Sequence, residues 1–191
     1  MARSKEFDID HVLGKAMAIF WQQGYEKTSM QDLVTGMGIH KRSMYDTFGD
    51  KHTLFMKAME RYAEQVASRM EGRVADAPSA KAAIRLLLEA TVYRQKEDPY
   101  GCLLVNTAVE LSNHDPEAKD KVNFAFEGTE RLLERLVRQG QASGEITSHL
   151  AAADLAAFLH NTFVGLRVLV KTLDKDSDKL QSIIDTTLAM L

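Results

Sequence analysis

Residues 28–55, TSMQDLVTGMGIHKRSMYDTFGDKHTLF, decide the fold of this chain. The segment predicts a short helix that begins after Thr28-Ser29 and ends at the glycines Gly36 and Gly38. A second short helix is expected over about residues 40–48, and Asp50 can cap a longer one. Two short helices joined by a glycine-containing turn are the pattern of a helix-turn-helix DNA reader.

Capping residues support these boundaries. Ser29, followed three residues later by Asp32, resembles a capping box with Asp in place of Glu. Upstream, a helix is expected over about residues 10–23, where apolar side chains recur on one face and Gly24 ends the run. The sequence therefore predicts a trihelical head that leads into a longer connecting helix.

Further helices are expected over about residues 80–95, 102–111, 117–141 and 152–171, with one more at the end of the chain. The breaks between them fall at 74–79, at Asp98-Pro99-Tyr100-Gly101, at 113–116 and at Gly144. The predicted fold is all-α. Its predicted parts are a helix-turn-helix domain over 1–50, a connecting helix over 51–73, and a helical effector-binding and dimerisation domain over 74–191.

The composition is that of a helical protein with enough apolar residues to form a hydrophobic core. The chain has 191 residues, of which 45% are hydrophobic, and only three are prolines. The single cysteine, Cys102, rules out an intrachain disulfide and suits a reducing compartment. Because no apolar run is long enough for a signal peptide or a membrane span, we expect a cytoplasmic protein without membrane contact.

The net charge gives no sign of a large positive field. It is −3 overall, and residues 1–60 carry eight Lys or Arg against eight Asp or Glu. Any contact with DNA must therefore depend on a few placed cations and on backbone N–H groups.

The predicted recognition helix has one inward and one outward side. Met44 and Phe48 lie four residues apart and are expected to pack inward. Arg and Lys on the outward side can donate to guanine, and hydroxyls or the start of a helix can meet phosphates. The candidate DNA contacts are Thr28, Ser29, His40, Lys41, Arg42, Ser43, Tyr45 and Lys51.

Residues 10–56 resemble the DNA-binding domain of the tetracycline-repressor (TetR) family of transcription regulators. The resemblance is carried by Ala18, Phe20, Gly24, Tyr25, Thr28-Ser29-Met30, Leu33, Gly38-Ile39, Ser43-Met44-Tyr45, Phe48, Lys51, Leu54 and Phe55, with Gly144-Glu145-Ile146 also familiar. It implies a homodimer that reads a palindromic operator, a divergent ligand-binding body, and dimerisation through the last two long helices. By the same resemblance, Thr28, Ser43, Tyr45 and Lys51 take the usual DNA-contact positions.

Two positions depart from the family pattern. His40 stands where Ser or a similar cap usually opens the recognition helix, and it caps poorly. Arg42 stands where the family usually has Gly, which adds bulk near the DNA. We expect Arg42 itself to supply a base or phosphate contact, and Lys51 to act as a phosphate clamp.

The body offers candidates for an effector pocket but no signature. Polar or aromatic residues set among apolar helical positions suit a mixed lining, although each is also compatible with core or interface packing. The candidates are Tyr62, Tyr93, Cys102, Asn106, His160, Asn161, Phe163 and Arg167.

Two features of the predicted helical domain invite a chemical interpretation: the lone cysteine and a short group of possible metal ligands. A lone buried cysteine such as Cys102 usually behaves as a small hydrophobe, while a place near a helix N-terminus would favour its thiolate. Glu110 and His114 lie four residues apart beside Asp115 and could share a metal, yet no third ligand stands at a clear spacing. We therefore expect no metal and no cofactor.

The last two helices are strongly apolar for the end of a chain. They either pack within one subunit or bury a second face against the same pair in another copy, as in an isologous dimer. The candidate interface residues are Leu155, Leu159, Phe163, Leu166, Ile183, Ile184 and Leu188.

The sequence favours a homodimeric DNA-binding regulator, most simply a repressor released by a small molecule. One alternative is a helical dimer that serves as a protein-interaction module without DNA binding. Another is a small helical enzyme, for which the chain has no phosphate-binding glycine loop, no His-Glu-x-x-His and no nucleophile elbow. We expect no enzymatic activity.

Overall fold

A computed structural model describes residues 7–93, 101–173 and 178–191 of the chain. Every regular element in these ranges is an α-helix, which confirms the predicted all-α class. The helices are α1 (Ile9–Gln23), α2 (Met30–Met37), α3 (Lys41–Phe48), α4 (Lys51–Val74), α5 (Ala80–Val92), α6 (Leu103–Leu111), α7 (Pro116–Ser143), α8 (Ala152–Leu169) and α9 (Asp178–Ala189). Most of the break expected at residues 98–101 lies outside the described residues, as do positions 94 and 95 of the expected helix.

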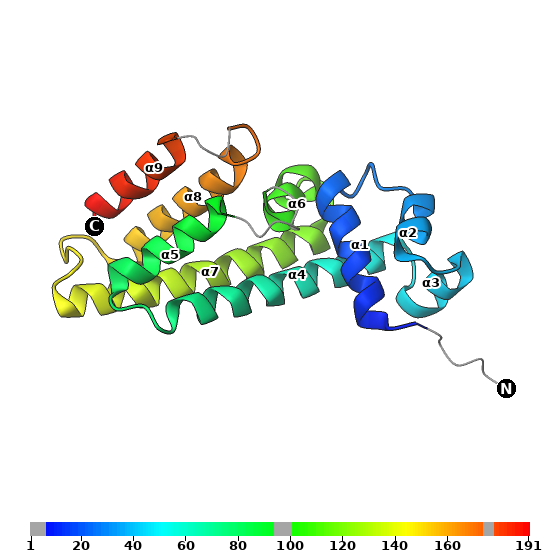
Figure 1. The fold of residues 1–191 in the computed structure, drawn as a ribbon, viewed down its shortest axis with the longest axis horizontal. Helices are drawn as coiled ribbons and strands as arrows, with labels where there is room; N and C mark the ends of the chain where they lie inside the picture. The colour runs from blue at the N-terminus through cyan, green and yellow to red at the C-terminus, as the bar shows by residue number, and fades with distance from the viewer. Residues whose placement is uncertain (1–6, 94–100, 174–177) are drawn as a thin grey trace.

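The two longest helices, α4 and α7, lie against each other and run along the long axis of the molecule (Figure 1). The trihelical head of α1, α2 and α3 sits at one end of this pair, and α6 packs beside α1. Helices α5, α8 and α9 lie over the other end. None of the helices in the described ranges has both the length and the apolarity needed to cross a membrane.

The start and end of α2 are fixed by short-range contacts. The Ser29 hydroxyl accepts a hydrogen bond from the N–H of Asp32, and the Asp32 carboxylate accepts one from the N–H of Ser29, so the predicted capping box is confirmed. Gly38 closes the helix in the left-handed conformation, with φ of 71°, which glycine adopts without steric cost.

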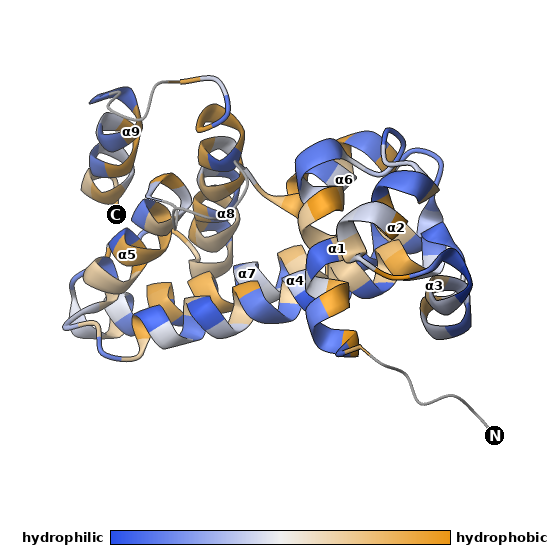
Figure 2. Cartoon of the chain, turned by 45° about the vertical axis from the view of Figure 1, so that its right-hand side comes forward, coloured by the Kyte–Doolittle hydropathy of each residue, from blue (hydrophilic) through white to orange (hydrophobic). Residues whose placement is uncertain are grey.

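Buried side chains form two clusters that α4 and α7 both enter, and Figure 2 shows hydrophobic and hydrophilic residues alternating along these helices. We call the cluster nearer the N-terminus the proximal core. It joins the buried residues of α1, α2, α3 and the first turns of α4 to Cys102, α6 and the start of α7. The distal core joins Met70 of α4 to the buried residues of α5, α8, α9 and the C-terminal half of α7. Helix α6 thus shares its core with the head, although it lies in the segment 74–191 that the sequence assigned to the effector domain.

The apolar stripe of α8 and α9 faces inward. Six of the seven candidate interface residues are buried in the distal core of a single chain, and Ile183 packs against that core; the six are Leu155, Leu159, Phe163, Leu166, Ile184 and Leu188. Side chains already enclosed by their own chain have little surface left for a second copy, so we reassign them from the interface to the core. The outer side of α8 instead presents Phe158, which is 40% exposed, and Val168, which is 46% exposed.

Candidate functional site

Helix α3 is held to the head by its inward side. Met44 is fully enclosed and Phe48 is 3% exposed, both in the proximal core, which confirms that they pack inward. The opposite side leaves Lys41, Arg42 and Tyr45 exposed. The arrangement fixes the helix while its outward face stays open.

The N-terminus of α3 lacks a side-chain cap. His40 occupies the N-cap position but its side chain makes no capping hydrogen bond, as the sequence predicted. The first N–H groups of α3 are therefore available to an anion, and the helix dipole favours negative charge there. The Arg42 side chain is 93% exposed, and its Nε lies 3.8 Å from Asp46 Oδ2, a loose surface pair that leaves it free to reach outward.

The two hydroxyl residues before α2 are engaged within the head. Thr28 is 1% exposed, and its hydroxyl donates to the carbonyl oxygen of Gly24 at 2.5 Å. Ser29 donates to the Asp32 carboxylate at 2.6 Å. The structure thus gives Thr28 a part in shaping the loop before α2, and its side chain has no surface from which to touch DNA.

Lys51 stands at the start of α4 and rests on an aromatic ring. Its Nζ lies 4.3 Å from the centroid of the Tyr25 ring. Tyr25 in turn packs on Phe55, with ring centroids 4.8 Å apart. This contact orients the ammonium group at the helix N-terminus, a role for Tyr25 that sequence reasoning did not identify.

A carboxylate from α6 fixes the loop between α1 and α2. Glu110 Oε2 accepts the N–H of Tyr25 at 3.0 Å, and its Oε1 accepts the N–H of Glu26 at 2.9 Å. The sequence offered Glu110 only as a possible metal ligand with His114. The structure instead turns His114 Nε2 toward Glu26 Oε1 at 4.0 Å, so the two residues do not converge on a metal.

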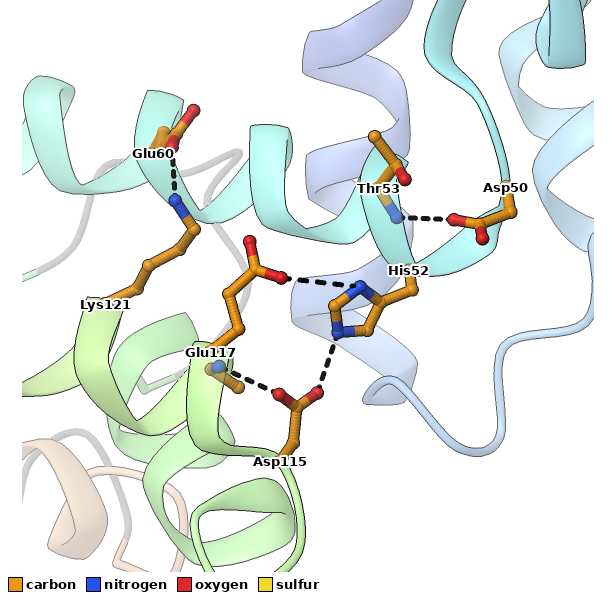
Figure 3. A network of polar contacts seen from close by, with 8 residues as sticks. Asp50, His52, Thr53, Glu60, Asp115, Glu117 and Lys121 are labelled. Atoms are coloured by element: carbon orange, nitrogen blue, oxygen red, sulfur yellow. Dashed lines mark hydrogen bonds and ion pairs between the residues drawn. The ribbon is translucent and has the colours of Figure 1, made fainter.

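A second polar link joins α4 to the corner between α6 and α7, and Figure 3 shows it from close by. His52 Nε2 lies 2.9 Å from Asp115 Oδ2, and His52 Nδ1 lies 3.9 Å from Glu117. Burial pushes the pKa of Asp115 up, but the N–H of Ala118 and the His52 ring outweigh it, and the pKa is lowered overall. The first link thus ties the head to α6, and the second ties the start of α4 to the start of α7.

Four of the candidate effector residues come together between the two cores. Arg167 Nη1 lies 3.4 Å from the Tyr62 hydroxyl, and its Cζ lies 4.4 Å from the centroid of the Phe163 ring. The buried Cys102 neighbours both Tyr62 and Arg167. Tyr62 and Cys102 belong to the proximal core and Phe163 to the distal core, so Arg167 spans the boundary.

Two further residues complete this group, which we call the effector cluster: Trp21, Tyr62, Cys102, His160, Phe163 and Arg167. The Trp21 ring packs edge-on against Tyr62, with centroids 4.8 Å apart. His160 packs against Phe126 with centroids 5.1 Å apart, and burial lowers its pKa, which keeps the imidazole neutral near pH 7. Burial also raises the pKa of Tyr62 far above its usual value.

Other candidates lie apart from the cluster. Tyr93 is 60% exposed, and its hydroxyl donates to Gln181 at 3.3 Å. The Asn106 amide oxygen accepts from Lys171 at 2.7 Å, and Asn161 is exposed on α8. Trp21 was not a candidate, because nothing in its neighbouring sequence indicates a binding site. Only the fold brings the end of α1 to Tyr62.

Known proteins match both halves of this arrangement. A family model described as bacterial regulatory proteins, tetR family, matches residues 12–58, and one described as tetracyclin repressor-like, C-terminal domain, matches residues 80–187. The chain belongs to the TetR family. This TetR-family chain is a DNA-binding transcription regulator with the helix-turn-helix head and helical body that its sequence predicted.

Relatives and solved structures extend the match over the whole chain. It is 35% identical to the uncharacterized HTH-type transcriptional regulator YezE of Bacillus subtilis, over 100% of both chains. It is 32% identical to the HTH-type transcriptional repressor ComR of Escherichia coli, over 98% of this chain and 90% of ComR. A cysteine mutant of the TetR-family regulator CifR, solved with 26-base-pair operator DNA, has a TM-score of 0.87 at 29% identity, covering 98% of each chain.

Proposed function

We propose that this TetR-family regulator is a homodimeric, cytoplasmic repressor, without enzymatic activity, that leaves a palindromic operator when a small molecule binds its body. The observation that carries the proposal is the open outward face of α3, with Lys41, Arg42 and Tyr45 exposed on a helix that Met44 and Phe48 anchor. The likeness to ComR, which is named a repressor, supports the sign of regulation.

On DNA, α3 enters the major groove with its N-terminus first. Lys41 and Arg42 reach base edges or flanking phosphates, and the Tyr45 hydroxyl and Ser43 take phosphate or base contacts. The uncapped N–H groups after His40 meet a phosphate. Lys51, oriented by the Tyr25 ring, binds a phosphate beside the groove.

The second copy is proposed to dock on the outer side of α8 and α9. Phe158 and Val168 are exposed apolar side chains on that side of α8, and Asn161 lies between them in sequence. An isologous contact between two such faces gives a four-helix seam and sets the two heads at a fixed spacing.

Release requires an effector that binds one arrangement of the heads better than the other. The effector cluster lies where the proximal and distal cores meet, so a ligand there changes how the two cores sit against each other. Glu110 and Asp115 carry that change to the head, because they hold the α1–α2 loop and His52.

The test is selection of bound sites from random duplexes, followed by mobility shifts at two salt concentrations and by sedimentation of the free protein. We expect a palindromic site, one dimer per site and a steep loss of affinity with salt. A monomer with no preference among duplexes at low salt would contradict the proposal. A dimer with no such preference would favour the protein-interaction module instead.

A further inference from the structure

Near the C-terminal end of α8, Arg167 is a half-buried cation without an anion beside it. Arg167 Nε is sealed from solvent and has no hydrogen-bond partner. Among the residues that the structure describes, no carboxylate lies within ion-pair distance of its guanidinium, whose neighbours are the Tyr62 hydroxyl, the Phe163 ring and the Cys102 thiol. Because arginine stays protonated in proteins, this is a half-buried positive charge whose Nε is shielded from water.

Other arginines of the same chain find carboxylates even where water would screen them. Arg85 Nη1 lies 2.8 Å from Asp185 and 3.3 Å from Glu89, and Arg61 Nη1 lies 2.9 Å from Asp10. A buried charge is costly unless it is paired and hydrogen-bonded. Arg167 shares with Arg61 a buried Nε that has no partner, but unlike Arg61 it has no carboxylate beside its other nitrogens among the residues that the structure describes.

Two more unpartnered polar atoms belong to the same cluster. Trp21 Nε1 and His160 Nε2 are buried and make no hydrogen bond. Trp21 packs on Tyr62, which meets Arg167, and His160 lies two turns before Arg167 on α8, where its neutral ring can donate from Nε2. Buried polar groups are normally satisfied, so three such atoms in one cluster suit an acceptor from outside the chain, either ordered water or a ligand.

We propose that the effector of this regulator is a small organic acid whose carboxylate group binds to Arg167. The fork of guanidinium N–H groups matches two carboxylate oxygens, and Trp21 Nε1 or His160 Nε2 supplies a further donor. The Phe163 ring, already against the guanidinium, meets the apolar part of the ligand. The inference rests on the proposed function, because it names the ligand class for the same effector cluster.

Carboxylate binding at Arg167 would also change the contacts between the effector cluster and the head. Arg167 is shared between Tyr62 of the proximal core and Phe163 of the distal core. An anion that takes the guanidinium weakens its contact with Tyr62, on which Trp21 of the head is packed. The head then loses part of its support from the body.

The chain contains a single tryptophan, Trp21, so its intrinsic fluorescence reports on this cluster. The probes are straight-chain carboxylates from acetate to octanoate, each titrated beside its own primary amide. We expect a saturable fluorescence change, with at least one carboxylate bound about tenfold or more tightly than its amide. The same carboxylate is expected to release the selected operator in a mobility shift, and its amide is not.

Arg167→Met is the deciding variant and Arg138→Met its control, because Arg138 is exposed on α7 and paired with Glu134. Arg167→Met is expected to keep its fold and operator binding but to bind carboxylate and amide equally, while Arg138→Met behaves as the parent chain. Should the methionine variant unfold, Arg167→Lys keeps the charge and is expected to retain the preference for the carboxylate in weakened form.

Equal binding of carboxylates and amides by the parent chain, no response to any of them, or an undiminished preference in Arg167→Met would overturn the proposal. The two proposals fail separately. A protein that binds its selected operator but ignores carboxylates refutes the ligand class and leaves the repressor function standing. A protein that prefers carboxylates but selects no duplex refutes the repressor function.

Discussion

The trihelical head and the effector cluster differ in how their polar groups find hydrogen-bond partners. In the head, Ser29 and Asp32 cap each other across three residues, and Thr28 bonds to Gly24 four residues away. In the cluster, Trp21, His160 and Arg167 come from distant parts of the chain, and each keeps a buried nitrogen without a partner. The capping groups at the start of α2 are satisfied within the head, whereas we propose that a ligand completes the cluster. This difference separates a part that must be rigid from a part that must respond.

The largest expected effect is a loss of stability when a large side chain is removed from the proximal core, which the head shares with α6 and α7. Phe55 is 1% exposed and packs against Phe20 and Tyr25, so Phe55→Ala is expected to lower the free energy of unfolding by about 3–5 kcal/mol. Because α4 and α7 enter both cores, Trp21 fluorescence and far-UV circular dichroism should still report one urea transition. Two separated transitions would show that head and body unfold as independent units.

A change on the outward face of α3 tests the head as a reader. Arg42 is almost fully exposed, so Arg42→Ala is expected to leave stability unchanged and to weaken operator binding by about 1–3 kcal/mol. Relaxed preference at one base pair marks a base contact, and equal losses on all duplexes mark a phosphate contact. Arg138→Ala, another exposed arginine with a partner four residues away, is the control. Unaltered affinity in both variants would remove Arg42 from the interface.

The link between the two regions is tested at Glu110. Glu110→Ala leaves the N–H groups of Tyr25 and Glu26 without their acceptor, and we expect a loss of about 1–2 kcal/mol in unfolding free energy. Hydrogen exchange of those two amides should speed up, and operator affinity should respond less to effector. Glu127→Ala, at an exposed pair with Arg131, is the control. Unchanged exchange at Tyr25 and Glu26 would mean that Glu110 does not hold the loop.

The smallest effect is a gain of stability in the head. His40 gives α3 no side-chain cap, so His40→Ser is expected to stabilise the protein by about 0.5–1 kcal/mol in thermal or urea unfolding. Ser29→Ala, which removes an existing cap from α2, should cost about 1 kcal/mol and serves as the opposite case. A destabilising His40→Ser would show that His40 already supports the helix start in another way.

Much of this molecule could be predicted from local sequence. Capping residues and glycines act within a few positions, so the capping box at Ser29, the poor cap at His40 and the inward side of α3 were predicted, and the structure confirms them. Partners that lie far apart in sequence were not found. Glu110 and Tyr25 are 85 residues apart, and Tyr62 and Arg167 are 105 apart. The apolar stripe of α8 was read correctly as a buried face, but nothing in it told a core from an interface.

The sequence by itself determined the helices, the reading head and the family, because periodicity, caps and turn residues are properties of neighbouring positions. Only the tertiary structure decided that the apolar stripe of α8 packs into the core of its own chain, that α6 packs with the head, and that Arg167 lies between the two cores without a carboxylate partner. The reason is that burial and charge pairing depend on contacts between distant segments, which only the packed chain brings together.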